Sequence, residues 1–244
     1  RLQVKLHSRL FNGLLMNRAE LERRFNHGMR LSVYAKSLWL PNPVDRYNSY
    51  YPTEWRPGDW NNSLNVRFSR KHRKGPATCS MVVEARTSAL LSDFDYHYIQ
   101  AEYTNQVDLW KRKLELRSRG FVRFGLGNDL APESAVFGAM ANPEEISDRP
   151  WARAVGAVPY GGMFNFGPTI DAQFQHQGGL NLRGYAGYAM VEEDKNGIAL
   201  PVYSGHSGAA VNAELAFDGL IPIKNRWMRK HLDLDTYFFG DAGI

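Results

Sequence analysis

The stretch KRKLELRSRGFVRFGLG, residues 111–127, decides the fold that this sequence predicts. Charged side chains take most of its odd positions, namely Lys111, Lys113, Glu115, Arg117, Arg119 and Arg123. Apolar side chains take most of its even positions, namely Leu114, Leu116, Val122, Phe124 and Leu126. Phe121 is a bulky exception on the charged face, and Arg112 and Ser118 are polar exceptions on the other. Because successive residues of a strand point to opposite faces, this period indicates a β-strand with one charged and one apolar face.

The length of this run separates two kinds of β-protein. Strands of globular proteins have roughly 5 or 6 residues, whereas a tilted membrane strand needs roughly 9 to 11. A run that extends over residues 111–127 therefore favours a barrel strand that continues beyond the bilayer. Its charged face predicts a charged lumen.

The same alternation recurs along the chain. It predicts strands over Arg1–Leu10, Met29–Leu40, Ser63–His72, Cys79–Leu91, Asp95–Val107, Thr169–Gln175, Ala209–Asp218 and Leu232–Ile244. Roughly nine or ten long strands in consecutive order are typical of an up-and-down meander that closes into a barrel. The pattern is already present at Arg1 and still present at Ile244, so we expect a single barrel domain over residues 1–244 that is a fragment of a longer chain.

Bulk composition leaves a soluble alternative open. The chain is 43% hydrophobic and 23% charged, its mean hydropathy is −0.44, and no run approaches 18 apolar residues. These values exclude a transmembrane helix, but a membrane barrel exposes apolar residues only at every second position and is compatible with them. A soluble β-sandwich or lipocalin-like barrel also alternates, and such a domain would bind a ligand, for example a sugar, through its exposed aromatic residues.

Charge and chemistry-bearing residues indicate neither nucleic-acid binding nor an enzyme. The net charge is +5, yet the cations alternate with apolar residues instead of clustering, so we expect no nucleic-acid partner. The seven histidines are scattered and Cys79 is the only cysteine, which predicts no metal, no cofactor and no internal disulfide. The Ser204-Gly205-His206 run lacks the GxSxG pattern of hydrolases. Glu144 and Glu145 are interpreted as a solvated loop pair.

Long polar segments separate the expected strands. They are Asn42–Asn62, Ala131–Pro150, Pro159–Gly167 and Glu192–Gly208, and in a barrel they belong to the outer side of the membrane. Trp55 and Trp60 are candidates for the membrane interface, although simple loop packing explains them equally well.

Two short motifs stand out near the end of the chain. Gly178-Gly179-Leu180-Asn181-Leu182-Arg183-Gly184-Tyr185 predicts a tight turn that presents a guanidinium. Phe239-Gly240-Asp241-Ala242-Gly243 lies on an alternating strand in which Phe239 and Asp241 share the polar, lumen-facing side.

With these motifs the sequence resembles the BamA-like superfamily, the bacterial surface antigen family of outer-membrane assembly barrels and two-partner secretion transporters. The resemblance covers Thr169–Ile244. Leu182-Arg183-Gly184-Tyr185 matches the family's (V/L)RG(F/Y) tip of a long loop that folds into the lumen, and residues 239–243 match its FxDxG strand motif. The resemblance implies that Arg183 pairs with Asp241 and that Glu214 is the inward glutamate of the intervening strand.

The family also implies what this chain does and what surrounds it. Its barrels have 16 strands and follow periplasmic POTRA domains, so the resemblance implies that a periplasmic domain and the last strands lie outside this chain. It implies a bacterial outer-membrane location, contact with lipid and lipopolysaccharide, polypeptide substrates, and periplasmic or lipoprotein subunits. The expected function is insertion or translocation of polypeptides without covalent catalysis. The alternative is a barrel that anchors a separate hydrolase domain elsewhere in the protein.

Overall fold

The computed structural model describes residues 1–11, 14–39, 58–88, 91–110, 113–138, 144, 179–182, 191–193, 199–201, 204–217, 220 and 236–244. These residues form an almost entirely β structure. The long strands are β1 (Leu2–Phe11), β2 (Leu14–Arg24), β3 (Met29–Trp39), β4 (Trp60–Lys74), β5 (Ala77–Thr87), β6 (Asp95–Leu109), β7 (Leu114–Asp129), β12 (Gly208–Ala216) and β13 (Tyr237–Gly243). The short elements are a 3-10 turn (Pro132–Ser134) and strands β8 (Val136–Phe137), β9 (Val191–Glu193), β10 (Ala199–Pro201) and β11 (Ser204–Gly205).

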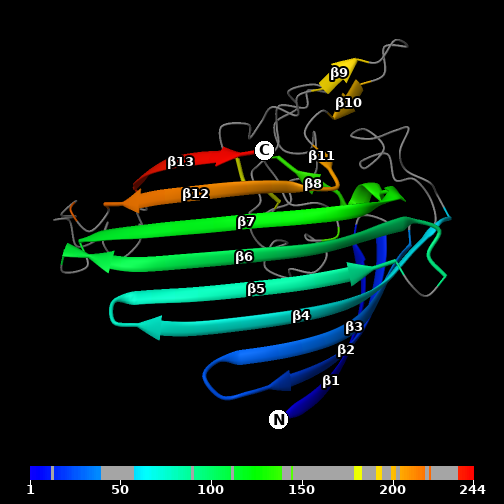
Figure 1. The fold of residues 1–244 in the computed structure, drawn as a ribbon, viewed down its shortest axis with the longest axis horizontal. Helices are drawn as coiled ribbons and strands as arrows, with labels where there is room; N and C mark the ends of the chain where they lie inside the picture. The colour runs from blue at the N-terminus through cyan, green and yellow to red at the C-terminus, as the bar shows by residue number, and fades with distance from the viewer. Residues whose placement is uncertain are drawn as a thin grey trace, which may run out of the picture.

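The nine long strands form one antiparallel sheet in the order β1-β2-β3-β4-β5-β6-β7-β12-β13. Figure 1 shows a curved wall, with β1 to β3 curling away from the viewer and β13 at the opposite edge. The predicted all-β fold of long, consecutive antiparallel strands is therefore confirmed, and the open, curved sheet has the form of an incomplete barrel. In the part of the chain that the structure describes, no helix is long and apolar enough to span a membrane.

Strand β2 is the element that the sequence analysis missed. Its residues include Leu, Met, Ala, Glu and Arg, which favour a helix. The segment is nevertheless a strand, because it forms backbone pairs with β1 on one side and β3 on the other. Other strand limits also differ from expectation. β5 ends at Thr87 and not at Leu91, which has a left-handed φ of 59°, and β4 begins at Trp60. The strands expected at 169–175 and at 232–235 lie outside the described residues.

The register gives the sheet two chemically opposite faces. One lateral row of paired residues crosses seven strands and is entirely apolar: Val4, Leu21, Val33, Val66, Ala85, Ile99 and Phe124. The next row points the other way and is entirely polar: Gln3, Glu22, Ser32, Arg67, Glu84, Gln100 and Arg123. We call the first side the outer face and the second the inner face.

Burial on these faces is the reverse of that in a soluble protein. Val4 on the outer face is 73% exposed and the other large apolar residues of its row are also exposed, whereas Arg123 on the inner face is 4% exposed and Glu22 and Glu84 are buried. Charged residues are almost never fully buried in soluble proteins unless they are paired, and large exposed apolar patches mark interaction or membrane surfaces. The outer face packs against no second sheet of the described residues, which argues against a soluble sandwich.

The two ends of the strands also differ. At one end, which we call the turn end, tight turns at residues 25–28 and 75–76 join the strands, with Gly28 and Gly75 at φ values of 72° and 59°. At the other, the loop end, the long segments 40–59 and 130–207 leave the sheet, while the turn end also carries one long connection, 217–236. Trp60, a candidate for the membrane interface, lies at the loop end of the outer face and stacks on Trp39 at 5.1 Å between ring centroids. Trp55 lies outside the described residues.

Candidate functional site

A short segment from the motif-bearing loop lies on the inner face. Its described residues are Gly179–Leu182, which we call the loop stem. The stem runs beside β8: Leu180 N donates to Phe137 O at 3.0 Å and Leu182 N donates to Gly138 O at 2.9 Å. These bonds fix the backbone that leads into the Leu182-Arg183-Gly184-Tyr185 motif.

An apolar cluster holds the loop stem against the wall. Leu180 and Leu182 are buried together with Val136, Phe121 and Ala210. This cluster explains Phe121, the bulky exception on the charged face of residues 111–127, because its ring is the apolar site on β7 that the stem covers. Removal of these side chains from water stabilises the docked stem.

Two polar residues of the wall complete the attachment. Asn212 on β12 directs Nδ2 toward Asn181 O at 2.9 Å, Leu180 O at 3.3 Å and Asp241 Oδ1 at 3.1 Å. Arg119 on β7 donates through Nη2 to Gly179 O at 2.8 Å and through Nη1 to Asn212 Oδ1 at 3.0 Å. Glu102 on β6 accepts from both Nε and Nη2 of this arginine and balances its charge.

The register shows where the predicted wall residues lie. Asp241 is paired with Asn212, Phe239 with Glu214, and Gly243 with Ala210, so all of them belong to inner-face rows. Glu214 lies 3.5 Å from Arg117 Nη1. A Cβ on Gly243 would lie 2.7 Å from Ala209 O, so this position needs glycine for close approach of the backbone.

The predicted loop residues are only partly within the described chain. Gly179 has a φ of 53°, as a tight turn requires, and Leu182 is buried. Gly178, Arg183, Gly184 and Tyr185 lie outside the described residues. The pairing of Arg183 with Asp241 therefore stays a prediction, and the described geometry brings the backbone of Asn181 and the carboxylate of Asp241 to the same amide of Asn212.

A second attachment corrects the interpretation of Glu144. This residue was expected in solvent, but it is buried on the inner face. Lys36 Nζ on β3 lies 2.8 Å from Glu144 Oε1, and Arg86 Nη1 on β5 lies 2.7 Å from Glu144 Oε2. Ser134 Oγ donates to Glu144 Oε2 at 2.6 Å. A buried carboxylate is tolerated only with such partners, and two buried cations of the wall supply them here.

The neighbouring residues extend this attachment over further strands. Asn61 on β4 donates to Glu133 Oε1 at 2.5 Å and to Ser134 Oγ at 3.0 Å. Arg123 on β7 donates to Ser134 O at 2.9 Å, and Arg86 Nη2 donates to Asn61 Oδ1. We call Lys36, Asn61, Arg86, Glu133, Ser134 and Glu144 the clamp cluster. It ties Glu133, Ser134 and Glu144 to β3, β4 and β5, and Arg123 adds a contact from β7.

The two carboxyl groups of the clamp cluster differ in acidity. Burial opposes ionisation of Glu144, but the charges of Arg86 and Lys36 and the hydrogen bonds from Lys36 and Ser134 hold its pKa well below the usual range. Burial raises the pKa of Glu133, only partly offset by the hydrogen bond from Asn61. Glu144 is therefore the ionised member that pairs with both clamp cations.

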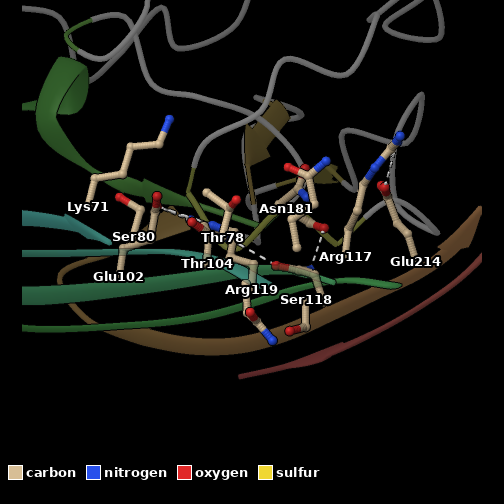
Figure 2. A pocket seen from close by; sticks show the side chains of 13 residues that line it. Lys71, Thr78, Ser80, Glu102, Thr104, Arg117, Ser118, Arg119, Asn181 and Glu214 are labelled. Atoms are coloured by element: carbon tan, nitrogen blue, oxygen red, sulfur yellow. Dashed lines mark hydrogen bonds and ion pairs between the residues drawn. The ribbon is translucent and has the colours of Figure 1, made fainter. Parts of the chain in front are cut away.

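An open pocket of about 410 Å³ lies on the inner face toward the turn end. Figure 2 shows Lys71, Ser80, Thr78 and Thr104 on one side of it and Arg117, Glu214 and Asn181 on the other. Arg119, Glu102 and Asn212 also line it, so the pocket adjoins the loop stem. Its surface is rich in hydroxyl, amide and charged groups, which can form hydrogen bonds with a polar or charged ligand.

Strand pairing and hydrogen bonds hold the Ser204-Gly205-His206 run and the following Ser207 in place. β11 pairs with β8, Tyr96 Oη donates to His206 O at 3.0 Å, and Gly125 N donates to Ser207 Oγ at 2.9 Å. Among the residues that the structure describes, no three His, Cys, Asp or Glu side chains gather as metal ligands.

Sequence reasoning missed Asn212 and the role of Arg119 in the loop attachment. Arg119 was visible only as one cation of an alternating strand, and Asn212 as one amide on another. The one available signal was Phe121, an apolar residue on a charged face, which marks a place where something packs against that face.

No protein-family model matches the sequence, and no curated protein matches it. Among solved structures, BamA from Haemophilus ducreyi lacking POTRA domains 1–3 is similar, with 14% sequence identity and a TM-score of 0.44. The similarity covers 94% of this chain and 41% of that chain, so the present chain spans less than half of its length. A likeness of this degree leaves the function to be argued from the site itself.

Proposed function

We propose that this chain is the wall of a BamA-like outer-membrane β-barrel whose inner face holds a docked loop, and that the barrel inserts or translocates polypeptides. The observation that carries the proposal is the reversal of the two faces. Seven strands place an exposed apolar row directly beside a polar inner row. Hydrocarbon is the solvent that suits such an outer face, and a polar lumen suits the inner one.

The dimensions of the strands agree with a bilayer. β4, β6 and β7 have 15, 15 and 16 residues. At about 3.3 Å per residue and a tilt of roughly 40°, such strands rise by about 35 to 40 Å, which exceeds a hydrocarbon core of about 30 Å. Three of the four connections at the turn end are short, namely 25–28, 75–76 and 110–113, and the longest segment, 130–207, leaves from the loop end. This distribution supports a turn end that lies in the periplasm.

The loop stem supports the finer part of the proposal. A chain segment folded into a lumen loses conformational entropy and needs anchors, and Phe121, Arg119 and Asn212 provide them. The stem leads directly into the LRGY motif, for which we propose the Arg183–Asp241 pair, with Glu214 facing the same lumen. Polypeptide substrates, outer-membrane lipid and lipopolysaccharide, and periplasmic or lipoprotein subunits are the partners that this proposal includes.

Labelling of two adjacent residues tests the membrane wall. Val66 on the outer face is 44% exposed and the side chain of Arg67 on the inner face is 41% exposed, so they form a matched pair. In the full-length protein with Cys79→Ser, each is changed to cysteine and labelled with an environment-sensitive fluorophore in lipid vesicles. We expect lipid-borne quenchers to act on position 66 and aqueous quenchers on position 67. Equal quenching at both positions, or the reverse order, contradicts a membrane wall.

Transport is tested separately. Vesicles that contain the full-length protein receive an unfolded outer-membrane protein, and its folding is followed by protease resistance. We expect faster folding than in empty vesicles and a slower rate with Arg183→Ala. An unchanged rate in protein-containing vesicles refutes the insertion activity and leaves the membrane wall standing.

A further inference from the structure

A basic hairpin projects from the wall at the turn end. Residues 69–83, SRKHRKGPATCSMVV, contain four Arg or Lys residues, one histidine and no acidic residue. They form the end of β4, the turn at Gly75–Pro76 and the start of β5. We call Arg70, Lys71, Arg73 and Lys74 the rim cations. All four are exposed.

The rim cations lack partners, unlike the buried and partly buried cations of the clamp cluster and the loop attachment. Arg86 and Lys36 both pair with Glu144, and Arg119 pairs with Glu102. Within the part of the chain that the structure describes, no rim cation forms a side-chain hydrogen bond or an ion pair. The fold therefore gives its buried cations carboxylate or carbonyl partners and leaves a group of positive charges without a side-chain partner at the mouth of the lumen.

Alternation divides the rim cations into two pairs that face opposite sides. Lys71 and Arg73 belong to inner-face rows, and Arg70 and Lys74 to outer-face rows. The inner row of Lys71 continues through Ser80, Thr104, Arg119 and Asn212 to Asp241, so it leads from the rim to the loop stem. In Figure 2 the Lys71 amino group extends away from the sheet and meets no other side chain of the pocket.

The backbone holds Lys71 in place. Lys71 N donates to Gly28 O at 3.1 Å, and a Cβ at Gly28 would collide with Lys71 O. The turn at residues 25–28 therefore packs closely on β4 and can do so only with glycine at this position. Because the platform is preformed, binding of a ligand here orders little except the side chains themselves.

We propose that the inward rim cations Lys71 and Arg73, with the hydroxyl-lined pocket beside them, bind acidic segments of polypeptides at the periplasmic mouth of the barrel. The inference rests on the proposed function and specifies its substrate class. Uncompensated cations at the mouth of a cleft raise the local concentration of anionic ligands and steer their approach. Ser80 and Thr104 then offer hydroxyl groups for hydrogen bonds to the carboxylates and backbone of an extended chain.

A lipid headgroup is the competing ligand, and the orientation of the pairs decides against it. A headgroup at the membrane surface meets the outer face, where Arg70 and Lys74 lie. It does not meet the lumen side, where Lys71 lines the pocket and Arg73 is paired with Thr78 of the pocket lining. The two pairs carry the same charge on the same strand, so each serves as the control for the other.

The test compares the variants Lys71→Gln/Arg73→Gln and Arg70→Gln/Lys74→Gln in the full-length protein, held in nanodiscs of zwitterionic lipid. The probe is a fluorescein-labelled peptide of repeated Gly-Ser-Glu triplets, and the same peptide with Gln in place of Glu is the blank. Binding is read by fluorescence anisotropy. We expect the inward variant, Lys71→Gln/Arg73→Gln, to bind the peptide about fivefold to tenfold more weakly at low salt, because it loses two exposed charge interactions. We expect the outward variant, Arg70→Gln/Lys74→Gln, to change the affinity less than twofold.

The salt series and the remaining outcomes complete the test. The difference between the variants should vanish near 1 M salt, where the screening length is about 3 Å. Equal losses in both variants indicate unspecific charge attraction and overturn the proposal, as does no loss in either. A loss confined to the outward variant, together with binding to anionic lipid, overturns it in favour of headgroups. The quenching of labels at positions 66 and 67 reports on the barrel independently, so failure of peptide binding is distinguishable from failure of the proposed function.

Discussion

Replacement of Glu144 by glutamine tests the clamp cluster most directly. The change keeps the size of the side chain and removes its charge, so Lys36 and Arg86 lose their common counter-ion. Their side chains are 4% and 0% exposed, and water does not replace the lost partner. Glu22 on β2 provides the matched control, because it also contacts two cations, Lys5 and Arg24, but these are 30% and 46% exposed.

The expected magnitudes follow from that difference in exposure. Removal of one partner from a buried ion pair lowers stability by about 3 to 5 kcal/mol, because an uncompensated charge stays buried. An ion pair with solvent-exposed cations contributes roughly 0 to 1 kcal/mol. We therefore expect Glu144→Gln to lower the free energy of unfolding by about 3 kcal/mol or more, and Glu22→Gln by about 1 kcal/mol or less.

Guanidinium unfolding of the full-length protein in lipid vesicles, followed by tryptophan fluorescence, measures both values. A double-mutant cycle with Lys36→Met then isolates the pair, since methionine removes the second charge and fills a similar space. The double variant should be more stable than the sum of the single effects predicts, by about 1 to 3 kcal/mol. Strict additivity, or equal losses for Glu144→Gln and Glu22→Gln, refutes the reasoning.

Three further predictions concern the inner face. Phe121→Ala removes the apolar support of the loop stem and should lower the free energy of unfolding by about 3 to 5 kcal/mol. It should also raise single-channel conductance. An unchanged conductance indicates that the stem stays docked without Phe121. If Arg183 and Asp241 pair, the effects of Arg183→Ala and Asp241→Ala on the free energy of unfolding should also be non-additive in a double-mutant cycle. Additive effects argue against the pair. The pKa of Glu144 is lower in the folded chain than its ordinary value of 4.5, which applies to the unfolded chain. The contribution of Glu144 to the free energy of unfolding is therefore complete above pH 4.5 and falls as the pH drops below that value. Glu144→Gln should remove this part of the pH dependence of unfolding.

The sequence predicted the strands best where alternation was strong. Residues 111–127 show the period with three exceptions, Phe121, Arg112 and Ser118, and β7 runs from Leu114 to Asp129 with the expected faces. β2 was missed because Leu14 and Leu15 disturb the period at its start and its composition suits a helix. Pairing on both sides determines its conformation, and such long-range pairing is not visible in a local window.

The site was predictable only where a motif marked it. Alternation assigns Asp241, Glu214 and Phe239 to one face, and the register pairs Asp241 with Asn212 and Phe239 with Glu214; their role in a lumen motif stays a prediction. Glu144 could not be assigned, because its partners Lys36 and Arg86 lie 108 and 58 residues away in sequence. A charged residue in a polar segment predicts exposure by default, and only tertiary structure shows that it reaches two buried cations.

The distribution of charge pairing along the inner face indicates how its two ends differ. At the loop end, Lys36, Asn61, Arg86 and Arg123 come from four strands and are buried, so each requires a partner, and residues 133, 134 and 144 provide it. The segment covers these wall side chains and also supplies their partners, so the wall and the segment stabilise each other. At the turn end, Lys71 and Arg73 are solvated and need no partner for stability. Charge at the loop end therefore holds residues 133, 134 and 144 on the wall, whereas charge at the turn end is solvated and available for a ligand.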